Sequence, residues 1–140
     1  DSVCALGEML EGYGARLAAG RASPSEIGIL REMVSDDAGR VADPAALALS
    51  NRRFHRQIHD ASHNRYLNQM LAAMRRSLAL LSGTTLAVQG RGRISIEEHD
   101  AIIAAIEARD EIGAEEAARR HIRNAYKARL RLEAQRKEGA

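Results

Sequence analysis

Aromatic side chains, cysteines and long apolar runs are all scarce in this sequence. Only 3% of its 140 residues are aromatic and none is tryptophan, whereas alanine, leucine, arginine and glutamate are abundant. This composition favours helix over strand, because alanine and straight-chain residues lose little side-chain entropy in a helix. The single cysteine, Cys4, cannot form an internal disulfide, and no window approaches the roughly 20 apolar residues of a membrane-spanning helix. We therefore expect an all-α, soluble, cytoplasmic protein without a membrane partner.

A strong excess of one charge is missing as well. The 21 basic and 19 acidic side chains give a net charge of +2, and the two signs are interleaved along the chain. A domain that grips a DNA duplex normally carries a denser basic stripe. We therefore do not expect this chain to bind DNA by itself. Its length suits a single domain with its own core, covering residues 1–140.

Helix-start signals and helical periodicity divide the chain into six expected helices. Ser23, Asp43 and Asp110 are placed to cap helices, and Ser95 with Glu98 has the pattern of a capping box. The helices are expected from Val3 to Gly20, from Pro24 to near "DDAGR", from Pro44 to about residue 62, from Asn64 into "SGTT" or "QGRGR", from Ser95 to before Asp110, and from Glu111 to about Gln135. The connections between them are short, which predicts an antiparallel bundle.

Two helix faces stand out in this pattern. The apolar stripe of the first helix consists of Val3, Leu6, Leu10, Tyr13 and Leu17. The last helix has a face of mostly small residues, which are Ala114, Ala117, Ala118, Ile122 and Ala125. Both faces are expected to pack inward.

The five histidines are the side chains most suggestive of chemistry. His55, His59 and His63 are spaced four apart in "SNRRFHRQIHDASHN", and His63 is expected in a solvated loop. His99 and His121 each lie one turn from apolar residues of their helices, so both should point inward. A buried imidazole is usually hydrogen-bonded to a neighbour. Three that converge in a bundle core can instead be satisfied together by one divalent metal ion, with zinc first and nickel or iron as alternatives.

Several segments, in order, resemble a family of bacterial regulators. The segments are "MLEGYGARLAAGRAS", "NRRFH" with "ASHNRYL", "EEHDAIIAAIEARD" and "AARRHI". They are similar to motifs of the ligand-sensing C-terminal domain, called FCD, of GntR-type transcriptional regulators of the FadR subfamily. The resemblance covers roughly residues 2–136. It implies an antiparallel bundle of six or seven helices with a central effector and metal pocket.

The resemblance also implies a set of metal ligands. In the metal-dependent members one acidic residue and three histidines hold a divalent ion, and a small organic acid completes its coordination. By position, the ligands here are Asn51, His55, His99 and His121. The family usually has Asp where this chain has Asn51, so the site is one negative charge short. Such a site should bind metal more weakly, or be more electrophilic towards an anionic effector.

The effector's carboxylate needs a partner in this scheme. Many relatives carry an Arg three residues before the "LE" pair of the first helix, where this chain has Gly7. We expect Arg75, Arg16 or Arg53 to substitute, with Arg75 preferred because it follows Met74 on the inner side of its helix. His59 is a further candidate pocket residue. Asp60 and Asp100 adjoin histidines, and are candidates for orienting an imidazole.

Three functions compete at this point. The first is a sensor in which binding of a small carboxylate shifts helix packing, as part of a homodimeric regulator that binds DNA through an N-terminal winged helix-turn-helix domain absent from this chain. The second is a zinc hydrolase, since three histidines and an open position can activate water. The third is a metal-free interaction or dimerisation bundle in which Asn51 and the histidines form a buried hydrogen-bonded network.

Overall fold

Most of the predicted helix caps form in the structure. It is a computed structural model and describes residues 2–78 and 84–139. Ser23 accepts a hydrogen bond from the Glu26 backbone N–H at 3.1 Å, and the Glu26 side chain accepts one from the Ser23 N–H at 2.8 Å. Asp43 and Asp110 also cap their helices, as predicted, each accepting from the backbone N–H three residues further on. The described helices are α1 (Ser2–Arg21), α2 (Pro24–Asp37), η1 (Ala38–Arg40), α3 (Pro44–Ala61), α4 (Arg65–Leu78), η2 (Thr85–Ala87), α5 (Arg91–Glu107) and α6 (Glu111–Glu138).

The prediction for the start of α5 is wrong. Ser95 does not cap this helix but is buried within it, because α5 begins one turn earlier, at Arg91. The preceding residue, Gly90, has a φ of 78°, a left-handed conformation that costs glycine little. This glycine lets the chain turn from η2 directly into α5. The expected continuation of α4 through Leu81 falls outside the described residues.

The inward face predicted for α1 is also wrong in part. Val3, Leu6 and Tyr13 are exposed, and Leu10 is the one buried residue of the predicted stripe. The buried face of α1 consists mainly of small residues, namely Gly7, Gly12, Gly14, Ala15, Ala18 and Ala19. It packs along the small-residue face of α6, where Ala114, Ala117 and Ala118 are buried as expected. Small side chains on both helices allow a close approach, which turns the larger residues of α1 outward.

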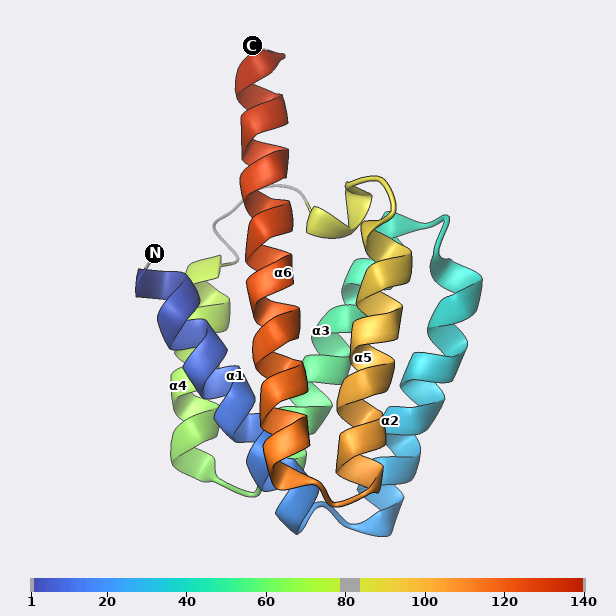
Figure 1. Cartoon of the computed structure of the whole chain (residues 1–140), viewed down its shortest axis with the longest axis vertical. Helices are drawn as coiled ribbons and strands as arrows, with labels where there is room; N and C mark the ends of the chain where they lie inside the picture. The colour runs from blue at the N-terminus through green and yellow to red at the C-terminus, as the bar shows by residue number, and fades with distance from the viewer. Residues whose placement is uncertain (1, 79–83, 140) are drawn as a thin grey trace.

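The helices form one antiparallel bundle. Successive α-helices alternate in direction, and α6 lies between α1 and α5 with its C-terminal end projecting beyond its neighbours (Figure 1). The main core cluster joins α1, α2, α3, α5 and α6, with Leu30, Phe54 and Ile103 fully buried. A smaller cluster of Leu10, Leu67 and Leu71 fixes α4 against α1. None of the helices formed by the described residues is long and apolar enough to cross a membrane.

Candidate metal centre and adjoining cavity

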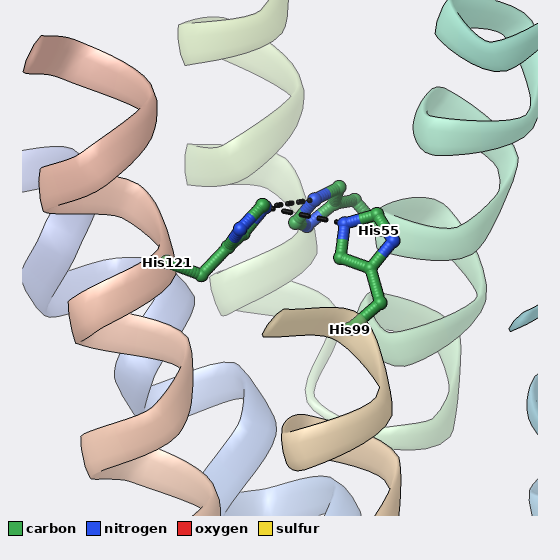
Figure 2. Close-up of side chains that lie close together, drawn as sticks. All are labelled: His55, His99 and His121. Carbon is green, nitrogen blue, oxygen red and sulfur yellow. Dashed lines mark hydrogen bonds between the residues drawn. The ribbon is translucent and has the colours of Figure 1, made fainter. Parts of the chain in front are cut away.

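Three imidazoles from three helices meet inside the bundle. His55 on α3, His99 on α5 and His121 on α6 point their rings towards one another (Figure 2). The Nε2 atom of His121 lies 3.1 Å from Nε2 of His55 and 3.2 Å from Nε2 of His99. His99 and His121 are buried and His55 is half-buried. We call these three residues the histidine cluster.

Neighbouring groups orient two of the three rings. The ring of His99 stacks on Phe54, with the ring centroids 4.3 Å apart. The Nδ1–H of His121 donates to Oε1 of Glu98 at 2.8 Å. Glu98 is held in turn by Arg91 at 2.7 Å and by the Asn124 amide at 2.6 Å. Because Nδ1 of His121 carries the proton, its Nε2 presents a lone pair to the centre of the cluster.

The surroundings of His99 and His121 keep these two imidazoles neutral. Burial lowers the pKa of His99 well below its usual value, and the charges of nearby His121, His55 and Arg91 add to this effect. Burial likewise lowers the pKa of His121 to about 4, although its hydrogen bond to Glu98 acts in the opposite direction. Burial alone would raise the pKa of Glu98, but its bonds from His121, Arg91 and Asn124 hold the pKa below its usual value. The result is neutral donor nitrogens backed by an ionised carboxylate.

This donor set fits a transition-metal ion. The three histidines form a group whose ligand atoms all lie within 4.8 Å of one another. Nitrogens around a tetrahedral zinc ion lie about 3.3 Å apart, since each Zn–N bond is about 2.0–2.1 Å. The spacings of 3.1 and 3.2 Å are close to that value. The Nδ1 atom of His99 is buried without a partner among the described residues, so the cluster is not a fully satisfied hydrogen-bonded network.

The fourth predicted ligand, Asn51, lies one turn before His55 on α3 and is half-buried. Two predicted acceptors are elsewhere: Asp100 pairs with Arg31 at the surface, and Asp60 is exposed. Glu98 takes the orienting role instead. The sequence offered one signal for it, since Glu98 directly precedes His99 within "EEH", but that position alone did not show that its carboxylate reaches the next helix.

His59 belongs to a second group of polar residues. Its Nε2 lies 2.7 Å from Oε2 of Glu11, and its Nδ1 lies 2.9 Å from the Arg75 guanidinium. Arginine only donates, so Nδ1 of His59 accepts and its Nε2–H donates to Glu11. The same carboxylate oxygen is 3.6 Å from Nδ1 of His55. Burial alone would raise the pKa of Glu11, but its contacts with His55 and His59 hold the pKa well below its usual value.

Glu11, His55 and His59 could also be considered as metal ligands from their spacing. Their hydrogen bonds argue against it. A metal on Nε2 of His59 would displace the proton there, while Nδ1 is already occupied as the acceptor of the Arg75 bond. Both nitrogens would then lack a proton, which leaves an imidazolate. Glu11 and His59 therefore fit a supporting role beside the histidine cluster better than a second metal site.

A cavity of about 510 Å³ adjoins this second group between α1, α4 and α6. Glu11 and Arg75 line it, so Arg75 lies where the sequence placed it, on the inner side of α4. The three histidines of the cluster are not among the described residues that line it. Arg16 lies apart from the cavity lining, 3.6 Å from Glu115.

The remaining polar candidates lie at the surface. Arg53 is exposed on α3. His63 lies in the exposed turn after α3, as expected, and pairs with Glu26 at 2.9 Å.

Comparison with known proteins agrees with this architecture. The model of one protein family, the FCD domain, matches residues 3–124. Streptococcus agalactiae GntR is 27% identical to the chain, with a TM-score of 0.71 over 86% of this chain and 55% of that one. E. coli McbR/YncC shares the fold, with 20% identity and a TM-score of 0.79 over 94% of this chain and 65% of that one. The chain thus spans less than two thirds of either protein. No curated protein matches it significantly.

Proposed function

Because the chain belongs to the FCD family, found in GntR-type transcriptional regulators, we propose that it senses a small carboxylate with the help of a bound divalent metal ion. The family implies a ligand-sensing, regulatory role. FCD domains of such regulators are not enzymes, which argues against the zinc hydrolase considered above. Family membership alone identifies neither the metal nor the chemical class of the effector, and both are part of this proposal.

The observation that carries the metal proposal is the convergence of three Nε2 atoms from α3, α5 and α6. His55, His99 and His121 would hold the ion, and the amide oxygen of Asn51 would be a weaker fourth ligand. Zinc is the first expectation, with nickel or iron as alternatives. When bound, such an ion would supply positive charge and link three helices that are distant in sequence.

The carboxylate proposal is supported by Arg75. Its guanidinium lies at the cavity wall and contacts His59, which ties the cavity to residues beside the histidine cluster. Arg16 remains a less favoured candidate, because its guanidinium is near Glu115 and away from the cavity. In the full regulator, we propose that effector binding changes helix packing and thereby the DNA affinity of an N-terminal domain in a homodimer.

Elemental analysis after exhaustive dialysis tests the metal centre. We expect about one equivalent of metal per chain, and loss of that metal in both His99→Ala and His121→Ala. The control is His63→Ala, which removes an exposed histidine outside the cluster and should retain the metal. Circular dichroism on each variant separates loss of ligand from loss of fold. Metal retained by the folded His99→Ala and His121→Ala variants would contradict the proposal.

One alternative is favoured by a specific observation. The Nε2 distances of 3.1 and 3.2 Å also suit a direct hydrogen bond, in which His55 or His99 donates its Nε2–H to the single lone pair on Nε2 of His121. The bundle would then be a metal-free interaction domain. The two functions differ in the dialysed protein, because a polar network predicts no stoichiometric metal and no change in thermal stability when a chelator is added.

A further inference from the structure

The adjoining cavity is lined by both apolar and charged side chains. Its walls from α1, α4 and α6 include Val3, Leu71, Met74, Leu78, Ile122 and Ala125. Arg75 and Glu11 supply charge on the side facing the second polar group. Arg129 and Glu133 also line the cavity, and carry opposite charges one turn apart on α6. The helix that carries Arg75, α4, has no acidic residue, so no charge on its own helix offsets this cation.

The donors of Arg75 are only partly used. A guanidinium has five N–H groups in a rigid fork, and one of them donates to Nδ1 of His59 at 2.9 Å. Within residues 2–78 and 84–139, Arg75 forms no salt bridge with a carboxylate. The bond to His59 holds the head group at the cavity wall without neutralising its charge. A carboxylate is the ligand group that such a fork recognises best.

The position of Glu11 determines how close an anion in the cavity can come to the histidine cluster. Its carboxylate lines the cavity, and it contacts His59 at 2.7 Å and His55 at 3.6 Å. An anion that moved from the cavity towards the histidines would approach this negative charge. The histidines do not line the cavity in the part of the chain that the structure describes. A carboxylate in the cavity thus has its favourable partner in Arg75.

Building on the proposed sensing function, we propose that the cavity binds a carboxylate with an unbranched apolar chain, held by Arg75 beside the metal centre and not on it. The apolar walls select the chain, since burying methylene groups is favourable. A hydroxylated acid of the same charge would gain less, because it would bury fewer methylene groups against these walls, while Ser77, Thr85 and Tyr126 supply only part of the polar lining. The volume of about 510 Å³ is within the range of small-molecule sites.

A series of simple acids tests the chain preference. Butanoate, hexanoate, octanoate and gluconate are titrated into the metal-loaded chain by isothermal titration calorimetry. Affinity should rise about three- to fourfold per added methylene, with gluconate weaker than octanoate. Equal affinity along the series, no binding of octanoate, or tighter binding of gluconate would overturn the proposal.

Two pairs of variants test the assigned residues. Arg75→Gln should lower octanoate affinity at least about tenfold, because a charge-assisted hydrogen bond is lost. The adjacent Arg76→Gln changes an exposed residue outside the lining and should leave affinity unchanged. Ala125→Leu narrows the cavity and should weaken octanoate more than butanoate, whereas Ala134→Leu, exposed on the same helix, should weaken neither. Equal effects of Arg75→Gln and Arg76→Gln in folded protein would overturn the assignment.

Repeating the titration after chelation separates this inference from the proposed function. Octanoate should still bind, with the same preference for longer chains and the same loss in Arg75→Gln. If a folded, chelated chain loses all octanoate binding, the carboxylate is a metal ligand, so the inference fails while metal-dependent sensing stands. If the purified chain holds no metal but binds octanoate through Arg75, the metal proposal fails and the inference stands.

Discussion

A single proton decides whether His121 can act as a ligand. An imidazole presents a lone pair at one nitrogen only when the other carries the hydrogen. Glu98 fixes that hydrogen on Nδ1 of His121, and Arg91 and Asn124 fix Glu98. His59 is fixed in the opposite sense, because Arg75 donates to its Nδ1. His121 therefore has a free lone pair that can bind a metal ion, whereas His59, which is similarly buried, has none.

Replacing Glu98 with Gln should weaken metal binding by about 10- to 100-fold. The amide lacks the negative charge that favours the Nδ1–H form of His121, and its NH2 group cannot accept from Asn124, which donates to the second carboxylate oxygen of Glu98. Competition with a chromophoric chelator measures the change. Glu97→Gln, at an exposed position of the same helix, provides the control. Equal metal affinity of the two variants would show that Glu98 has no positioning role.

The stability of the metal-free chain should fall in mild acid. The pKa of His121 falls from 6.5 to about 4 on folding, mainly through burial. As pH drops below about 6.5, the unfolded chain binds a proton that the folded chain refuses, so the free energy of unfolding decreases until about pH 4. The loss from this residue over that range is on the order of 3 kcal/mol. The lowered pKa of Glu98 adds a loss in the same direction below its usual value of 4.5.

Urea unfolding of chelated protein between pH 7 and pH 5 checks this dependence. The control is His63→Ala, which removes an exposed histidine outside the cluster, and its slope should stay steeper than that of His121→Gln. His121→Gln should show a shallower slope. Stability that stays constant over this pH range would contradict the burial of a neutral histidine.

At the scale of elements, a local sequence pattern predicts a helix cap correctly only where tertiary packing does not give the same residues other partners. Ser23, Asp43 and Asp110 cap helices where the sequence placed them, because a cap depends on residues within one turn. The pattern of Ser95 and Glu98 matches a cap equally well, yet Ser95 is buried inside α5. Glu98 is occupied by His121, Arg91 and Asn124. A local pattern cannot show whether a side chain caps its own helix or contacts residues of another helix, because the second possibility depends on the packed structure.

The start of α5 yields a paired prediction on glycine. Gly90→Ala should lower the free energy of unfolding by about 1–2 kcal/mol, because φ is 78° there and a Cβ is strained in that region. Gly28→Ala should raise it by about 0.5–1 kcal/mol, since this glycine is within α2 and a Cβ would meet nothing within 4 Å. Chemical denaturation measures both. Equal effects of the two substitutions would show that backbone conformation does not determine the start of α5.

At the scale of the whole molecule, the inward direction of His99 and His121 was predictable from helical periodicity. Their meeting with His55 was predictable only with the family resemblance, because three helices must be rotated correctly about their axes. The positions of Glu11 and Arg75 at a common cavity were harder to predict. Gly7 and the small-residue face of α1 set the distance between α1 and its neighbours, and Met74 lies 3.2 Å from where a Cβ of Gly7 would be. The distance between α1 and α4 depends on how all the helices pack, so it could not be predicted from the sequence of either helix.

Glu11 connects the two parts of the site, since it contacts His55 and His59 and also lines the cavity. Positive charge at the histidine cluster would offset the charge of Glu11 and make the cavity more favourable to an anion. Metal should therefore raise octanoate affinity about fivefold or more, and octanoate should raise metal affinity by the same factor.

Glu11→Gln should reduce this coupling to a factor near one while both ligands still bind, because the amide carries no charge for the metal to offset. The control is Glu8→Gln, on the same helix but outside the cavity lining and paired with Arg123, which should keep the coupling. Calorimetric titrations of each ligand with and without the other measure all four constants. A coupling that persists in Glu11→Gln would have to pass through another contact between α1, α4 and α6, and Glu11 would then be only a neighbour of both sites.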